Sequence, residues 1–352
     1  GGVEVVGNYA VFLAYVRRDY EGAEQLFQRA LELDPLRAET LINRAHFAEL
    51  CLADDEKAQS AFEAALSVCG DSHPSLLGSY ALFRSRTHED ESDENRALFQ
   101  RALDANPHDG ANLAAFASFL SGVLGQNEHA DALFRRAIEA CPTDACIIGS
   151  YASFVAEVLH DNDTAEVYFR RALEAAPDHT VNLGRFAYFL HAVRGDHHAA
   201  DAHYQRAVAC GRDADILGNY ATFLETEKDD YEAAEKYYKQ AVLADPTHSY
   251  NLSSYARFLA YTQNDNAAAN EFFSRAVASD LNDVAVINFY VDFLQNISDS
   301  DSNCPTYFRA AVTDFPQCAP LLQAFGEYLD EVVGDKAEAA AFLKRASEIV
   351  TL

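Results

Sequence analysis

Two histidines and an aspartate form the densest group of potential metal ligands. His197 and Asp201 stand four residues apart, one turn of a helix, and His203 follows closely. A zinc site needs a third or fourth close ligand at a clear spacing, which this group does not show, so we interpret these residues as surface histidines of a turn. Two acidic stretches, 87–94 and 298–303, lack the spaced oxygen ligands and the glycine of a calcium loop. The sequence therefore predicts no metal ion and no cofactor.

Cysteines and Asn-x-Ser/Thr sequons are candidate sites for disulfide formation and glycosylation. Of the seven cysteines, Cys141 and Cys146 are the close pair, and a disulfide could join them if the protein is extracellular. Asn162, Asn251 and Asn296 begin Asn-x-Ser/Thr sequons and are candidate glycosylation sites. The chain has no glycine-rich phosphate loop, nucleophile elbow or His-Glu-x-x-His motif, so we expect no enzyme.

A sequence repeat predicts the helices in which these residues lie. Ten alanines recur 34 to 37 residues apart, which is typical of a stacked repeat array. They are Ala30, Ala65, Ala102, Ala137, Ala172, Ala207, Ala241, Ala276, Ala311 and Ala346. We therefore predict a single array over residues 1–352, with repeats at about 3–38, 39–73, 74–110, 111–145, 146–180, 181–214, 215–249, 250–284, 285–319 and 320–352.

Each repeat contains two helical patterns, which we call helix A and helix B. In the first repeat, apolar residues recur at i, i+3, i+4 and i+7 from residue 6 and again from residue 23, and Pro35 follows. One helix pair cannot bury such faces alone, so the pairs must stack. The pattern predicts helix A starting near residues 5, 40, 76, 112, 147, 182, 216, 251, 286 and 321.

The recurring residues resemble the tetratricopeptide repeat, through Ala10, Ala23, Phe27, Ala30 and Pro35. Tyr-Ala-x-Phe followed by aromatic-x-Arg-Ala-Leu is also similar to the half-a-TPR variant of RNA-processing proteins. The chain departs from the family in having an aliphatic residue where a large aromatic is expected early in helix A. The proline that follows helix B is also present in only six of the ten repeats. The resemblance implies an all-α, right-handed α-solenoid (superhelix) of about ten repeats, with helix A lining a concave groove.

The resemblance also implies where a partner peptide would lie. Its contacts would include Asn8, Asn43, Arg185, Tyr188, Asn219, Arg257 and Tyr261 on the outward positions of helix A. Asn8 and Asn43 resemble the asparagines with which some members hold a terminal carboxylate, but Gly7 and Glu39 replace the accompanying lysines. The alternative is that these side chains simply face solvent.

An arginine precedes the anchor alanine in most repeats: Arg29, Arg101, Arg136, Arg171, Arg206, Arg275 and Arg345. Two interpretations remain open, an anion-binding stripe and a ladder of ion pairs between repeats. Abundant carboxylates favour the ladder.

The net charge of −28 argues against binding nucleic acid or an anionic membrane, and the absence of a long apolar run argues against membrane insertion. We expect partners to be proteins or peptides, or the chain itself. The favoured function is a protein–protein interaction scaffold using the concave groove, with a cytoplasmic location by default.

The alternative function is a structural subunit whose uncapped terminal repeats stack head to tail into a filament, which would fit an extracellular location. The end-to-end interface would then use Val3, Val5, Val6, Ile349, Val350 and Leu352.

Overall fold

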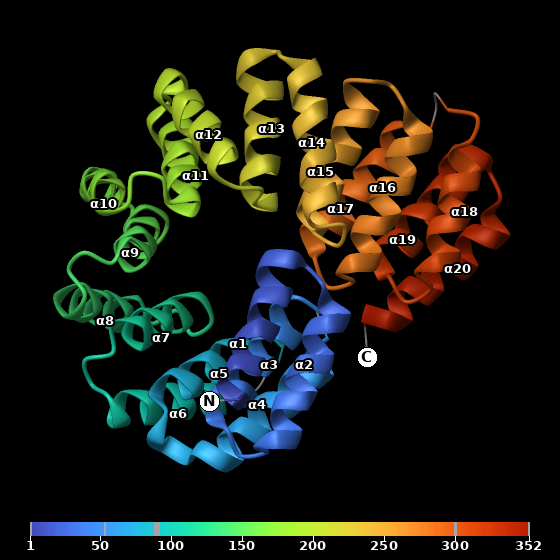
Figure 1. Cartoon of the computed structure of the whole chain (residues 1–352). Coiled ribbons are helices and arrows are strands. Elements are labelled where there is room, and N and C mark those ends of the chain that lie inside the picture. Colours follow the sequence, from blue (N-terminus) through green and yellow to red (C-terminus); the bar gives the residue numbers. More distant parts are fainter. Residues whose placement is uncertain (1, 53, 88–91, 299–300, 351–352) are drawn as a thin grey trace. The chain divides into compact units, whose positions relative to one another are not determined.

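The computed structural model describes residues 2–52, 54–87, 92–298 and 301–350, and these residues form helices and no strand. They fall into two compact halves, residues 1–177 and 178–352, each built of five helix pairs (Figure 1). The prediction of an all-α solenoid with about ten helix-turn-helix repeats is confirmed. None of the described helices is long and apolar enough to cross a membrane.

Helix A and helix B alternate without interruption in both halves. In the N-terminal half the pairs are α1 (Gly2–Phe12) with α2 (Tyr20–Leu33), α3 (Ala38–Leu50) with α4 (Asp55–Cys69), α5 (Pro74–Thr87) with α6 (Ser92–Ala105), α7 (Gly110–Gly122) with α8 (Asn127–Ala140), and α9 (Ala145–Glu157) with α10 (Asn162–Ala175). In the C-terminal half they are α11 (Thr180–Phe189) with α12 (His197–Cys210), α13 (Ala214–Lys228) with α14 (Tyr231–Ala244), α15 (Ser249–Tyr261) with α16 (Asn266–Ser279), α17 (Val284–Asn296) with α18 (Cys304–Asp314), and α19 (Ala319–Tyr328) with α20 (Lys336–Val350). π-Helical segments extend α1, α11 and α19, namely η1 (Leu13–Arg17), η4 (Leu190–Arg194) and η5 (Leu329–Val333).

Most of the first helices begin two residues before the predicted position, because a polar side chain caps them. The Asp109 carboxylate accepts a hydrogen bond from the backbone N–H of Asn112 at 3.1 Å, and Asp213 accepts one from Ile216. Such caps satisfy backbone donors that have no partner within the helix. The apolar pattern starts one turn later than the cap, so periodicity alone misplaces the start.

Aspartates also cap the second helices, which gives part of the acidic excess a structural role. The caps of α2, α4, α10, α12, α14 and α16 are Asp19, Asp54, Asp161, Asp196, Asp230 and Asp265. A carboxylate at this position also interacts favourably with the positive end of the helix dipole. Two turn histidines cap first helices, α11 and α15, because Nδ1 of the neutral ring of His179 and of His248 accepts a backbone N–H.

The anchor alanines lie where helix A and helix B cross. Eight of them, from Ala30 to Ala276, have no exposed surface. Their small side chains allow the two backbones to approach closely, and the aromatic residues pack around this contact.

Three aromatic rings meet at most junctions between repeats. Phe62 of α4 lies 5.5 Å from Tyr80 and 5.4 Å from Phe83 of α5, measured between ring centroids. Equivalent trios, which we call junction clusters, join Phe99 to Phe116 and Phe119, Phe134 to Tyr151 and Phe154, Tyr204 to Tyr220 and Phe223, Tyr238 to Tyr255 and Phe258, Phe273 to Tyr290 and Phe293, and Phe308 to Phe325 and Tyr328. Each cluster binds helix B of one repeat to helix A of the next.

Close packing of neighbouring first helices depends on glycine in two places. An added Cβ on Gly78 would lie 1.8 Å from Oδ1 of buried Asn112, whose Nδ2 donates to the Pro74 carbonyl at 3.0 Å. Gly218 and Asn251 repeat this arrangement, and Asn251 Nδ2 donates to the Ala214 carbonyl at 2.9 Å. The side chain of Asn251 is therefore buried in the fold, which leaves no room there for a glycan.

The recurring arginines tie repeats together. Arg136, Arg171 and Arg345 donate to the backbone carbonyls of Pro107, Pro142 and Pro316 in the preceding repeat. Arg101 and Arg206 instead pair with Asp71 and Asp178 of the preceding turn. These contacts favour the structural interpretation of the arginines over an anion-binding stripe.

We expect Ala172→Leu to destabilise the stack around α10, because a larger side chain has no space at this fully buried crossing. Overpacking of this kind costs roughly 1–3 kcal/mol. Thermal unfolding followed by circular dichroism measures the effect. The control is Glu174→Leu at an exposed position of the same helix, and equal melting curves for the two variants would contradict the assigned faces.

Candidate functional site

Among the first helices of the C-terminal half, α11 and α15 expose aromatic and cationic side chains, and half-buried Asn219 lies on α13. Helix α11 contacts α13, α13 contacts α15, and α15 contacts α17. Tyr188 of α11 and Tyr261 of α15 expose 46% and 51% of their surface, although most aromatic residues of the first helices are buried. We call this surface the helix-A face; it comprises Arg185, Tyr188, Asn219, Arg257, Tyr261 and Phe289.

Neighbouring helices fix the orientation of its central side chains. The Arg257 guanidinium lies 4.9 Å from the ring centroid of Phe289 on α17. Asn296 Nδ2, also on α17, donates to the Tyr261 hydroxyl at 3.3 Å. A cation held over a ring and a tyrosine held by its hydroxyl lose little conformational freedom when a ligand binds, which favours affinity.

Phe289 and Asn296 were not among the groove residues predicted from the sequence, in which Asn296 was a candidate glycosylation site. Phe289 occupies the position equivalent to Asn8, where most repeats have a small or polar residue. A large apolar residue at an outward position was the available signal. The contact of Asn296 could not be predicted, because it depends on how α15 and α17 are spaced.

A polar network sets the spacing of α13 and α15. Glu225 accepts hydrogen bonds from the Tyr238 hydroxyl at 2.8 Å and from the Thr262 hydroxyl at 3.1 Å. The Thr222 hydroxyl lies 3.0 Å from the same tyrosine oxygen. One carboxylate thus connects side chains from α13, α14 and the end of α15, beside the helix-A face.

A second link joins the starts of α13 and α15. His248 Nε2 lies 2.7 Å from Asp215 Oδ1. This hydrogen bond raises the pKa of His248, and it lowers the pKa of Asp215 with a further contribution from the positive charge of Arg185. The Asp215 carboxylate favours protonation of His248, whereas the hydrogen bond that Nδ1 accepts from the Asn251 N–H requires the neutral ring. Protonation therefore gains a charge beside Asp215 and loses the cap of α15.

The histidines near the start of α12 take separate partners. His197 Nδ1 lies 3.0 Å from Glu227, whereas Asp201 accepts a hydrogen bond from the Tyr220 hydroxyl at 2.9 Å and His203 packs on Phe186. The structure does not bring His197, Asp201 and His203 to one point. Among the described residues, no three His, Cys, Asp or Glu side chains could hold a metal ion together.

The other predicted residues are not part of this face. Asn8 is exposed on α1 and Asn43 half-buried on α3, both in the N-terminal half. Asn162 is half-buried at the start of α10, and Asn296 is exposed. The acidic stretches at 87–94 and 298–303 lie partly outside the described residues.

The close cysteines are not joined by a disulfide in the structure. An added Cβ on Gly110 of α7 would lie 2.7 Å from the Cys141 sulfur, which places the Cys141 thiol against α7. Cys146 lies in the first turn of α9 and is exposed.

The predicted end-to-end residues differ in their surroundings. Val5 exposes 67% of its surface, while Val3, Val6 and Ile349 are half-buried. Leu352 and the side chain of Val350 lie outside the part of the chain that the structure describes.

Comparison with known proteins identifies the fold. The tetratricopeptide repeat model matches residues 214–248, which are α13 and α14. This is a tetratricopeptide-repeat fold. A search of curated protein sequences gave no match.

Solved structures agree in fold over most of the chain. The human IFIT1 dimer with PPP-AAAA is similar over 99% of this chain and 83% of its own, with 15% identity and a TM-score of 0.61. The APC/C hetero-tetramer Cut9–Hcn1 is similar over 81% of this chain and 54% of its own, with 14% identity and a TM-score of 0.57. Yeast Tom70 is similar over 99% and 85%, with 14% identity and a TM-score of 0.50.

The prediction that excluded nucleic acid is wrong. It rested on net charge, yet the structurally similar IFIT1 is solved with the nucleic-acid ligands PPP-AAAA and m7Gppp-AAAA. Net charge sums over the whole chain, whereas a ligand interacts with the groups within roughly a Debye length, about 8 Å at physiological salt. A few arginines in one place can therefore outweigh carboxylates elsewhere.

The Asp215–His248 pair predicts a pH dependence. A raised pKa in His248 stabilises the fold below about pH 6.5 and loses this effect as the pH rises through the folded value. A lowered pKa in Asp215 stabilises it above about pH 4 and loses the effect as the pH falls through the folded value. The contribution of this partly exposed pair should be largest between about pH 4 and 6.5, and below about 1 kcal/mol.

Asp215→Asn removes the charge and leaves the His248 cap of α15 in place. We expect NMR titration of His248 to give a lower pKa in this variant than in the unmodified protein. Asp213→Asn, which alters the cap of α13 without contacting His248, serves as the control. The same midpoint in the unmodified protein and in Asp215→Asn would contradict the pair.

Proposed function

We propose that the chain is a non-enzymatic interaction scaffold, and that its helix-A face binds a segment of a partner protein. The observation that carries this proposal is the exposed tyrosine and arginine side chains on α11 and α15, the first helices on either side of α13, with Arg257 over Phe289 and Tyr261 held by Asn296. Tyrosine and arginine are over-represented among the residues that contribute most to protein–protein binding.

The composition of the face indicates the chemistry of its ligand. Arg185 and Arg257 offer planar groups that bind carboxylates, and the two tyrosines offer flat apolar surface with a polar tip. An extended segment with an acidic residue and apolar neighbours would match both features.

We predict that Arg257→Ala combined with Tyr261→Ala weakens peptide binding by at least about tenfold, as expected when two central contact residues are removed. Peptides selected from a displayed random library against the unmodified protein serve as ligands, and fluorescence anisotropy measures their affinity. The matched control is Tyr231→Ala combined with Lys239→Ala, which removes one aromatic and one cationic side chain from α14.

Equal losses in the two double variants would show that peptides do not bind specifically at the helix-A face. Selection of peptides that bind both variants as tightly as the unmodified protein would contradict the proposal. An oligoadenylate that competes with the peptides would favour nucleic acid as the ligand of this face.

A second candidate function, end-to-end assembly, is favoured by Tyr9 and Phe12. Their rings stack at 6.0 Å and expose 53% and 40% of their surface, whereas the equivalent Tyr80 and Phe83 expose 3% and 1% because Phe62 covers them. A second copy could cover Tyr9 and Phe12 with its own helix B. The contact would not close on itself and would build a filament.

Sedimentation velocity at increasing protein concentration tests this second function. We predict growth beyond dimers for the unmodified protein and its loss in Tyr9→Glu combined with Phe12→Glu, because two carboxylates cannot be buried in an apolar contact. Val167→Glu, on the exposed side of α10, is the control. A monomer at every concentration would contradict end-to-end assembly.

A further inference from the structure

A second binding surface lies in the N-terminal half, between two helices B. A hollow of about 630 Å³ separates α6 from α8, with α7 beneath it. Phe116, Leu120 and Leu133 line its apolar part, and Arg96, His129 and Arg136 stand around it. We call this hollow the α6–α8 groove.

Four repeats fill the equivalent place with an aromatic side chain of their own. Tyr168 of α10 packs against Tyr151 with ring centroids 4.8 Å apart and an interplanar angle of 83°. Tyr237 on Tyr220, Phe272 on Tyr255 and Phe342 on Phe325 repeat this contact at 4.8 Å. In the fourth repeat the corresponding residue is Leu133, as it is Leu98 in the third, so a smaller side chain than a ring packs on this side of Phe116.

The charges of the groove also depart from the other repeats. Asp131, Asp201 and Asn270 accept hydrogen bonds from the hydroxyls of Tyr151, Tyr220 and Tyr290 at 2.8, 2.9 and 2.8 Å. In the α6–α8 groove, Arg96 replaces the acceptor, and Phe116 has no hydroxyl to donate. Both members of the usual pair are therefore changed, and the change leaves a cation beside half-buried Leu133 and the edge of Phe116, which exposes 7% of its surface.

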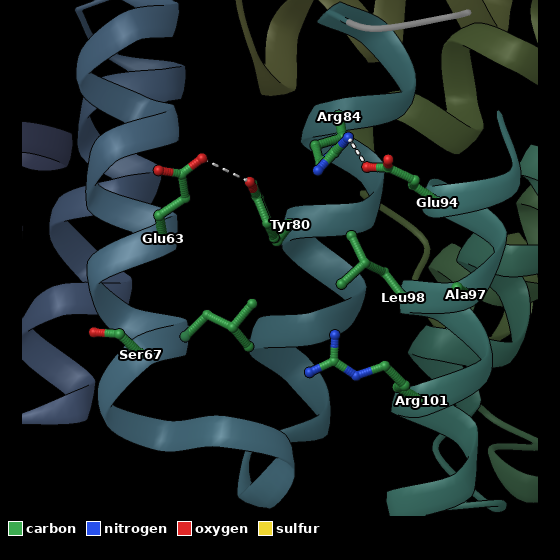
Figure 2. A pocket seen from close by; sticks show the side chains of 9 residues that line it. Glu63, Ser67, Tyr80, Arg84, Glu94, Ala97, Leu98 and Arg101 are labelled. Carbon is green, nitrogen blue, oxygen red and sulfur yellow. Dashed lines mark hydrogen bonds and ion pairs between the residues drawn. The ribbon is translucent and has the colours of Figure 1, made fainter. Parts of the chain in front are cut away.

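The neighbouring hollow, between α4 and α6, shows the contrast (Figure 2). Its charged side chains pair with partners of the chain: Arg84 with Glu94 at 2.7 Å, and Arg101 with Asp71. Glu63 accepts a hydrogen bond from the Tyr80 hydroxyl at 3.3 Å, as the figure also shows. This hollow offers little unbalanced charge to a ligand.

Arg96 and Arg136 hydrogen-bond neutral oxygens instead. Arg96 donates to the Gln126 side-chain oxygen at 2.7 Å, and Arg136 donates to the Pro107 carbonyl at 3.2 Å. Asp93 adds one carboxylate at the edge, so two guanidinium groups face one acid. In a chain with a net charge of −28, this surface is locally cationic.

We propose that the α6–α8 groove binds an acidic segment of a partner protein through an aromatic side chain. The partner's ring would pack on Leu133 and on the edge of Phe116 that reaches the hollow, and its flanking carboxylates would bind Arg96 and Arg136. Aromatic pairs favour this arrangement, and guanidinium–carboxylate hydrogen bonds are among the stronger ones in proteins. The site is independent of the helix-A face and can be tested separately.

The probe is a capped peptide, Asp-Glu-Phe-Glu-Asp, with a 4-fluoro label on the phenylalanine ring, followed by ¹⁹F NMR. The experiment uses the full chain at about 0.15 M salt, where the Debye length is about 8 Å and distant carboxylates are screened. We expect a saturable shift with the unmodified protein. The same peptide with alanine in place of phenylalanine, labelled on its cap, should bind at least about tenfold more weakly.

Two variants copy what other repeats have at these positions, so the fold has already accommodated them. Leu133→Tyr places against Phe116 the ring that Tyr168 supplies in repeat five. Arg96→Asp places at position 96 the carboxylate that Asp131 supplies at the equivalent position of the next repeat. We expect each to weaken binding at least about tenfold. Arg96→Asp should also bind Lys-Lys-Phe-Lys-Lys better than the unmodified protein does.

The matched control is Tyr168→Leu, which opens the equivalent place in repeat five next to the carboxylate of Asp131. It should gain no affinity for the acidic peptide. The proposal is overturned by the absence of a saturable shift up to about 1 mM peptide. Unchanged binding in Leu133→Tyr, or an oligoadenylate that binds in place of the peptide and is lost in Arg96→Asp, would overturn it equally.

Discussion

The contact of three aromatic rings at each junction cluster is the interaction on which the other features depend. It holds helix B of one repeat against helix A of the next, as Phe62 holds Tyr80 and Phe83. Aromatic pairs of this kind contribute about 0.5–1.5 kcal/mol each beyond the burial of their surface. Because every cluster uses side chains from adjacent repeats only, the array is stabilised by nearest-neighbour contacts. The outer positions of the helices are then available for binding.

The period of the alanines was sufficient to predict the helices and their pairing, because packing at a crossing constrains residue size strongly. The helix starts were less accurate, since caps such as Asp109 and Asp213 lie outside the apolar pattern. Of the helix-A face, Arg257 and Tyr261 could be named from the sequence. Their partners Phe289 and Asn296 could not, because these contacts depend on the distance between neighbouring helices.

The net charge of the chain does not describe the local charge of its individual surfaces. Many aspartates are helix caps that accept backbone N–H groups. Five of the seven arginines before the anchor alanines bond to the preceding repeat, two to carboxylates and three, with Arg136 among them, to neutral carbonyls that leave their charge unbalanced. A ligand interacts with the charge that these contacts leave unbalanced, and this charge differs from one surface to the next. Arg96 beside Phe116 and Arg257 over Phe289 are local exceptions within an acidic molecule.

The similarity of the junction clusters makes whole repeats interchangeable. Tyr204 meets Tyr220 and Phe223, while Tyr238 meets Tyr255 and Phe258. Excision of one period between these junctions would place Tyr204 against Tyr255 and Phe258, the same residue types in the same order. Duplication or loss of gene segments about 35 codons long could therefore lengthen or shorten such an array while every seam is preserved. Binding surfaces such as the α6–α8 groove then arise where single repeats have diverged from this common pattern.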